Sequence, residues 1–180
     1  MVTRLERWAI YFLFLFLSLT LMDSLTTYLG LTTFGLVESD PLTRSRIETM
    51  GTIKGIALTG LTNVAVVTLT LSLLVSPIRI LPKLRKHFRS HRLYSASYLM
   101  VISARILAFM LLVGCCFYLL PAVINNYTLI TLGTGLHTGR TLNTLFLIIG
   151  GLIGGALATS VCLKTGEIPT KQAIQEIPLT

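Results

Sequence analysis

Four apolar segments, each long enough to cross a lipid bilayer, constrain the fold of this chain more than any other feature of its sequence. They lie at about residues 8–31, 51–75, 94–120 and 141–163, and a helix needs about 20 such residues to cross the ~30 Å hydrocarbon core. Only 12% of the 180 residues are charged, whereas soluble domains carry about 25%. The sequence therefore predicts an all-α, polytopic membrane bundle of four transmembrane helices, folded as one domain over residues 1–180.

The first segment also has the outline of a secretory signal, because Arg4 and Arg7 precede its apolar run. A signal peptide has an apolar core of about 7–15 residues followed by a cleavage site of small residues. The run here is longer, and no such site follows it. We expect the segment to remain in the protein as its first membrane span.

The distribution of basic residues predicts the orientation of the bundle, because lysine and arginine concentrate in cytoplasmic loops. The N-terminus, the segment 76–93 and the C-terminal tail hold Arg4, Arg7, Arg79, Lys83, Arg85, Lys86, Arg89, Arg92, Lys164 and Lys171, whereas the opposite loops hold Arg44, Arg46 and Arg140. We therefore expect a multi-pass protein of the cell membrane with both termini in the cytoplasm. These loops explain the formal charge of +8, so we expect no nucleic-acid partner.

The segment 76–93 is expected to form a basic cytoplasmic loop. Pro77 and Pro82 are predicted to end the second span, and the residues after them have the pattern of an interfacial helix lying on anionic headgroups. The residues expected to bind these lipids are Lys83, Arg85, Lys86, Arg89 and Arg92. His87 and His91 lie four residues apart but have no third ligand, so we expect no metal.

Polar and small residues follow one face of the first span, at Thr20, Asp23, Thr27 and Gly30. Residues spaced by three and four share a helix face, and such a face should contact protein rather than lipid. A charged Asp23 in the hydrocarbon costs about 2.5–3.5 kcal/mol unless it is paired or protonated. Lys54 in the second span and Arg105 in the third are the alternative partners. Glu38, in the loop after the first span, would balance the second base.

These residues resemble the signature of an uncharacterised family of small prokaryotic integral membrane proteins. That signature is Asp-x-x-Thr-Thr, then Glu-x-Asn-Pro, then a lysine in the next helix. The matching positions are Asp23, Thr26, Thr27, Glu38, Asp40, Pro41 and Lys54. Asp40 departs from the family's asparagine, which keeps a tight turn but adds a charge. The resemblance covers at most the first three spans, and it implies a membrane bundle with a polar cluster but no assigned activity.

The fourth span is rich in glycine. Gly150, Gly151, Gly154 and Gly155 form two small-xxx-small pairs, and such pairs permit close contact between helix backbones. Two interpretations remain open at this point: packing within the bundle, and a docking face for another subunit.

The loop expected between the third and fourth spans, residues 121–140, contains the sequon Asn126-Tyr127-Thr128. Such a sequon is an acceptor for a glycan on an exposed loop. The sequence therefore marks Asn126 as a modification site in a glycosylating organism.

The sequence contains no motif for catalysis: no phosphate-binding glycine loop, no nucleophile with a positioned base and no His-Glu-x-x-His. Cys115, Cys116 and Cys162 have neither disulfide nor metal spacing. An enzyme is therefore the least supported class, and we expect no cofactor. We expect an accessory or scaffold subunit that meets lipids and other membrane subunits or a second copy. The alternative is a small ion or solute transporter that uses Asp23 as an intramembrane proton or ion site.

Overall fold

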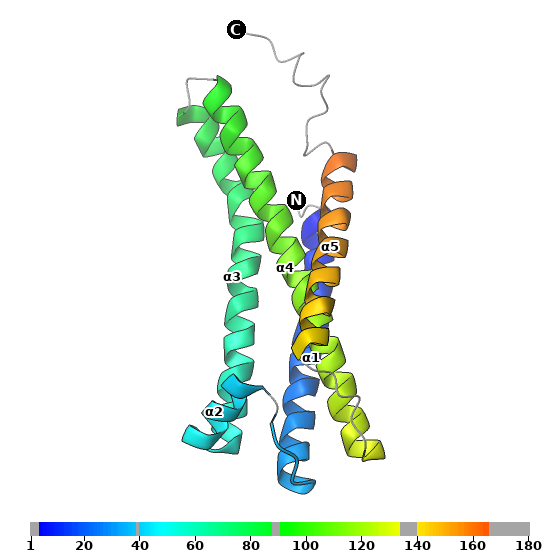
Figure 1. The fold of residues 1–180 in the computed structure, drawn as a ribbon. Helices are drawn as coiled ribbons and strands as arrows, with labels where there is room; N and C mark the ends of the chain where they lie inside the picture. Colours follow the sequence, from blue (N-terminus) through cyan, green and yellow to red (C-terminus); the bar gives the residue numbers. More distant parts are fainter. Residues whose placement is uncertain (1–3, 39, 88–90, 134–139, 166–180) are drawn as a thin grey trace.

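The computed structural model describes residues 4–38, 40–87, 91–133 and 140–165, and it describes side chains in these ranges outside 75–97 and 140–141. The chain forms five helices: α1 (Arg4–Thr33), α2 (Pro41–Met50), α3 (Thr52–His87), α4 (His91–Leu132) and α5 (Arg140–Lys164). All except α2 are long and apolar enough to cross a membrane. The prediction of an all-α bundle with four spans is confirmed (Figure 1).

Helix α4 is the centre of the bundle. It contacts α1, α3 and α5, and α3 also contacts α1 and α2. Half of the α4 span (50%) is buried inside the protein, against 17–22% of the other spans. The chain passes back and forth, so α1 and α4 run in one direction and α3 and α5 in the other (Figure 1). We call the two ends of the bundle the α2 side and the hairpin side, after helix α2 and the α3–α4 hairpin.

The core is apolar and lies mainly around α4. Phe109, Leu112 and Val113 are almost completely buried, and the ring of Phe109 packs edge-on against Phe12 of α1 with a centroid distance of 5.6 Å. The outward faces of the spans are also apolar, with large side chains left exposed along all four helices. A bundle that is apolar both inside and outside is typical of a protein surrounded by lipid.

Two of the spans continue about 12 residues beyond their predicted ends. Helix α3 does not end near Val75 but runs to His87, through both Pro77 and Pro82. Helix α4 does not end at Leu120 but runs to Leu132, with Pro121 inside it. Proline is tolerated within membrane helices because neighbouring groups satisfy the carbonyls it leaves free. The predicted loops 76–93 and 121–140 are therefore mostly helical wherever the structure describes them.

Helix α2 was not predicted. Asp40 caps it by accepting a hydrogen bond from the backbone N–H of Thr43, and Pro41 occupies its first turn. An N-cap aspartate followed by proline is a strong start signal, which the sequence interpretation took for a tight turn alone. The helix ends at Gly51, whose φ of 86° is accessible to glycine at little cost.

The glycines of α5 pack against α4. A Cβ atom added to Gly150 would lie 2.6 Å from the side chain of Phe117, and one added to Gly154 would lie 2.9 Å from Val113. Gly155 lies equally close to Met110, whereas a Cβ on Gly151 would have 3.9 Å of room. Within the described residues, the glycine-rich face thus serves contact between α5 and α4.

Candidate functional site

A cluster of polar side chains within the membrane-spanning region joins α1 to α4. The side-chain amide of Asn126 donates hydrogen bonds to Oδ1 of Asp23 at 3.1 Å and to Oγ1 of Thr27 at 3.2 Å. Asp23 and Thr27 share a face of α1 because they lie four residues apart. The preceding polar residue, Thr26, donates instead to its own helix, at the carbonyls of Met22 and Asp23. We call Asp23, Thr27 and Asn126 the polar cluster.

Asn126 is the residue that sequence reasoning missed, because it was assigned to an exposed loop as a glycan acceptor. It lies within α4, is half-buried, and has its amide nitrogen engaged with α1. The prediction that Asn126 lies in an exposed acceptor loop is therefore wrong. The signal that could have located it is the apolar run that resumes after Pro121 and continues to Leu132.

Neither expected base pairs with Asp23. Lys54 is exposed near the start of α3, and among the described residues no ion pair joins it to Asp23. Arg105 lies 21 residues before Asn126 on α4, which places it about 31 Å from the polar cluster along the helix. The expected pairs are therefore wrong, because α4 extends further toward the α2 side than its apolar core suggested.

Arg105 has a different partner at the opposite end of the bundle. Its side chain is 2% exposed, and its Nε donates a 3.1 Å hydrogen bond to the backbone carbonyl of Leu74 on α3. Leu74 lies three residues before Pro77 and next to Leu73, whose carbonyl loses its helical donor because proline has no N–H. Arg105 thus supplies a donor to α3 close to its proline.

The acidic residues after α1 shape the connection to α2. The carboxylate of Glu38 accepts a hydrogen bond from the backbone N–H of Asp40 at 2.8 Å. Oδ2 of Asp40 accepts from both the N–H and the hydroxyl of Thr43, at 2.9 and 2.8 Å. Leu36 packs on Gly30, so this connection folds back against α1. The connection thus places two acidic residues, Glu38 and Asp40, beyond the end of α1 that lies nearer the polar cluster.

Helix α2 is held on α3 by small and polar contacts. Ile47 packs on Gly55, where an added Cβ would lie 2.7 Å from the Ile47 backbone. The guanidinium of Arg46 donates to Oγ1 of Thr59 at 3.1 Å, and Thr43 lies 3.4 Å from the same hydroxyl. Arg46 was assigned to an exposed loop from the sequence, yet it anchors α2 beside the membrane-spanning part of α3.

The remaining residues that the sequence predicted as a site are the basic residues expected to bind anionic lipids. Lys83, Arg85, Lys86 and Arg92 lie on α3 and α4, but their side chains, and all of Arg89, lie outside the described residues. The C-terminal Lys171 also lies outside them.

Comparisons of the chain with protein-family models, curated proteins and solved structures found no match. The chemistry of the site must therefore be judged from its own residues. Within the described part of the chain, no group of three His, Cys, Asp or Glu residues could hold a metal ion. What the polar cluster offers is one carboxylate, one amide and one hydroxyl between two membrane helices, with acidic residues nearby.

Proposed function

We propose that the protein is an accessory or scaffold subunit of a larger complex in the cell membrane, with both termini and the α3–α4 hairpin in the cytoplasm. The observation that carries the proposal is the length of that hairpin. Helix α3 has 36 residues and α4 has 42, which correspond to about 54 and 63 Å of helix against a ~30 Å hydrocarbon core. The hairpin extends past the N-terminal end of α1 (Figure 1).

The part of the hairpin that extends past α1 is positively charged. Arg79, Lys83, Arg85 and Lys86 all follow Leu74, the last residue of α3 whose side chain the structure describes. Because α3 continues without a break to His87, Lys83 and Lys86 lie about 14 and 18 Å along the helix beyond Leu74. A basic helical extension of this length reaches far enough to meet an acidic surface on a neighbouring protein as well as the lipid headgroups.

A test starts from the full-length chain, purified in mild detergent from the membranes of its natural host and analysed by mass spectrometry and light scattering. We expect a second protein at constant stoichiometry. Replacing Lys83, Arg85 and Lys86 by glutamine should remove it. The matched control replaces Arg44 and Glu48, an exposed ion pair of α2 at 2.9 Å, by glutamine and should retain it. A chain that purifies alone as a single species contradicts the subunit proposal.

The orientation is tested separately with an impermeant thiol reagent on intact cells. Ser45 on α2 and Lys164 at the end of α5 are both exposed and lie on opposite sides of the bundle (Figure 1). We expect Ser45→Cys to react at once and Lys164→Cys to react only after permeabilisation, with the parent chain as the background. The reverse pattern would place the hairpin outside the cell.

A second candidate function, transport of a proton or cation through Asp23, rests on the polar cluster. An ionisable residue within a membrane span is a functional candidate, and among the described residues no base pairs with this one. We expect Asp23→Asn to abolish ion-driven flux in liposomes while leaving the fold intact, since asparagine keeps an acceptor for Asn126. Equal flux in the parent, the variant and empty liposomes excludes transport.

A further inference from the structure

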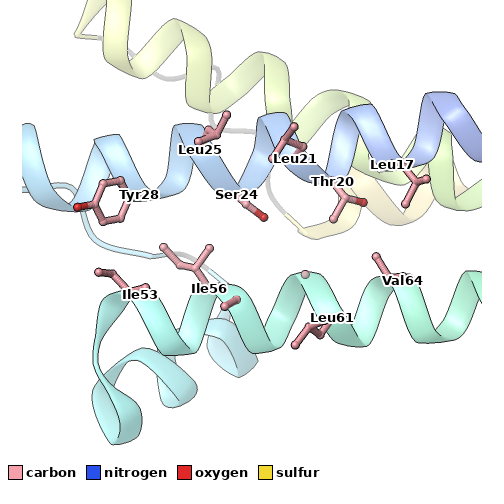
Figure 2. A pocket seen from close by; sticks show the side chains of 12 residues that line it. Leu17, Thr20, Leu21, Ser24, Leu25, Tyr28, Ile53, Ile56, Leu61 and Val64 are labelled. Atoms are coloured by element: carbon pink, nitrogen blue, oxygen red, sulfur yellow. The ribbon is translucent and has the colours of Figure 1, made fainter.

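An apolar groove of about 520 Å³ lies between α1 and α3 on the α2 side of the bundle. Figure 2 shows its lining, with Tyr28 and Ile53 at one end and Leu17 and Val64 at the other. The two helices approach closely here, since a Cβ added to Gly60 would lie 3.6 Å from the hydroxyl of Ser24. Both walls belong to membrane-spanning segments, so the groove is open to the hydrocarbon of the bilayer.

The length of the groove matches one leaflet. Leu17 and Tyr28 are 11 residues apart on α1, which corresponds to about 16 Å, and half of the hydrocarbon core is about 15 Å. A partner helix that crossed the membrane would need a groove along the whole span. A groove that ends near the middle of the bilayer fits the acyl chain of a lipid.

A free cation lies at the end of the groove where a headgroup would be. Lys54 is exposed, and no carboxylate among the described residues forms an ion pair with it. It lies seven residues before Leu61, which lines the groove, and residues seven apart share a helix face. Its flexible side chain can follow the helix to the depth of the phosphates. The charge of Lys54 is complementary to a phosphate.

We propose that this groove binds a phospholipid of the leaflet on the α2 side, with one acyl chain between α1 and α3 and the phosphate at Lys54. This binding requires no partner protein. It therefore stands or fails independently of the subunit proposal, and it concerns the leaflet opposite to the basic hairpin.

The test uses the full-length chain, delipidated in detergent and titrated with phosphatidylglycerol under native mass spectrometry. Ala57 lines the groove and is exposed, so Ala57→Phe fills it without disturbing the core. We expect this change to weaken binding about tenfold, because the acyl chain loses its apolar contacts. Ala65 is also exposed on α3 but lies outside the groove lining, and Ala65→Phe, the matched control, should bind like the parent. Leu61→Trp is a second filling variant, and thermal melts confirm folding.

The headgroup contact is tested by Lys54→Gln, which should weaken phosphatidylglycerol about fivefold. The same change should not alter binding of diacylglycerol, which lacks the phosphate. Equal binding by Ala57→Phe and Ala65→Phe overturns the proposal, as does equal affinity of the parent for the two lipids.

A substitution of Thr20 distinguishes a lipid in the groove from a polar occupant such as a partner helix. Thr20 lines the groove, and its buried hydroxyl has no hydrogen-bond partner among the described residues. An acyl chain offers it none and gains apolar contact from valine, so Thr20→Val should strengthen phosphatidylglycerol binding. A loss of affinity in Thr20→Val, or a dimer of the chain that Ala57→Phe dissociates, overturns the proposal in favour of a protein occupant.

Discussion

The amide nitrogen of Asn126 lies 3.1 Å from Oδ1 of Asp23, a hydrogen bond that ties α4 to α1 across 103 residues of sequence. The same nitrogen also donates to Thr27. These bonds replace the ion pair that the sequence suggested. They give the cluster a clear structural role whether or not Asp23 also has a functional one.

We predict that Asn126→Ala destabilises the bundle by about 1–3 kcal/mol, the cost of leaving a buried polar group without its partner. Asp23→Asn should be tolerated better, since its amide carbonyl still accepts the bond. Unfolding in mixed detergent micelles, followed by circular dichroism, measures both effects.

Two controls accompany this measurement. Asn125→Ala removes a neighbouring amide whose Oδ1 has no partner among the described residues, so it should cost less than Asn126→Ala. Lys54→Met removes an exposed base and should change stability by less than about 0.5 kcal/mol. A large loss in Lys54→Met with no loss in Asn126→Ala would restore the ion-pair interpretation.

The sequence predicted the contacts of the polar cluster that depend on one helix alone, but not those that depend on how two helices are aligned. The contact of Asp23, Thr27 and Gly30 with protein was predicted correctly, because their spacing is local to one helix, whereas Thr20 lines the groove between α1 and α3. The partner was missed because pairing depends on where α4 crosses α1. Pro121 was taken as the end of that helix, although α4 continues to Leu132, so Arg105 was placed too close to Asp23 and Asn126 too far from it.

The four spans were predicted because apolar length alone decides whether a helix can cross a bilayer. Their ends were not, because Pro77, Pro82 and Pro121 stop helices in water more strongly than in a packed bundle. Helix α2 is short and polar, with no apolar run to reveal it. Its start was nevertheless encoded in the Asp40-Pro41 pair.

The glycines of α5 give a prediction with an internal control. Gly150→Ala should destabilise the α4–α5 contact by about 1–3 kcal/mol, as overpacking does, because its Cβ would lie 2.6 Å from Phe117. Gly151→Ala has 3.9 Å of room and should be neutral or slightly stabilising, since alanine favours helix. Thermal melts of the two variants compare the sites directly. Equal destabilisation would mean that both glycines are needed for flexibility of α5 rather than for its packing.

The cap of α2 gives a third prediction. Asp40→Ala should cost about 1 kcal/mol through loss of the N-cap, whereas Asp40→Asn should cost little because asparagine is an equally good cap. Ile47 packs on Gly55, so a cysteine at position 47 reports whether α2 leaves α3. We expect faster thiol labelling of this reporter in the alanine variant only. Equally fast labelling in both variants would show that the charge of Asp40, and not its cap, holds the helix.

The last prediction concerns Arg105, which is buried and donates to the carbonyl of Leu74. Arg105→Met should destabilise the bundle by about 1.5–3 kcal/mol, the contribution of a hydrogen bond to a charged group. Arg4→Met, which removes an exposed base from α1, is the control and should be neutral. Exchange with lysine should not restore stability fully, because an ammonium lacks the fixed planar donors of the guanidinium.

The reason for this loss can be tested through Pro77, which leaves the carbonyl of Leu73, next to Leu74, without its helical donor. Pro77→Ala restores the N–H that bonds to the Leu73 carbonyl and so strengthens the turn that Arg105 supports, and α3 should then depend less on Arg105. A double-mutant cycle between Arg105→Met and Pro77→Ala should therefore show coupling of about 0.5–3 kcal/mol, as is found for residues that share partners. Additive effects would mean that Arg105 stabilises the hairpin through its other contacts. The turn of α3 at Pro77 would then not depend on the hydrogen bond from Arg105.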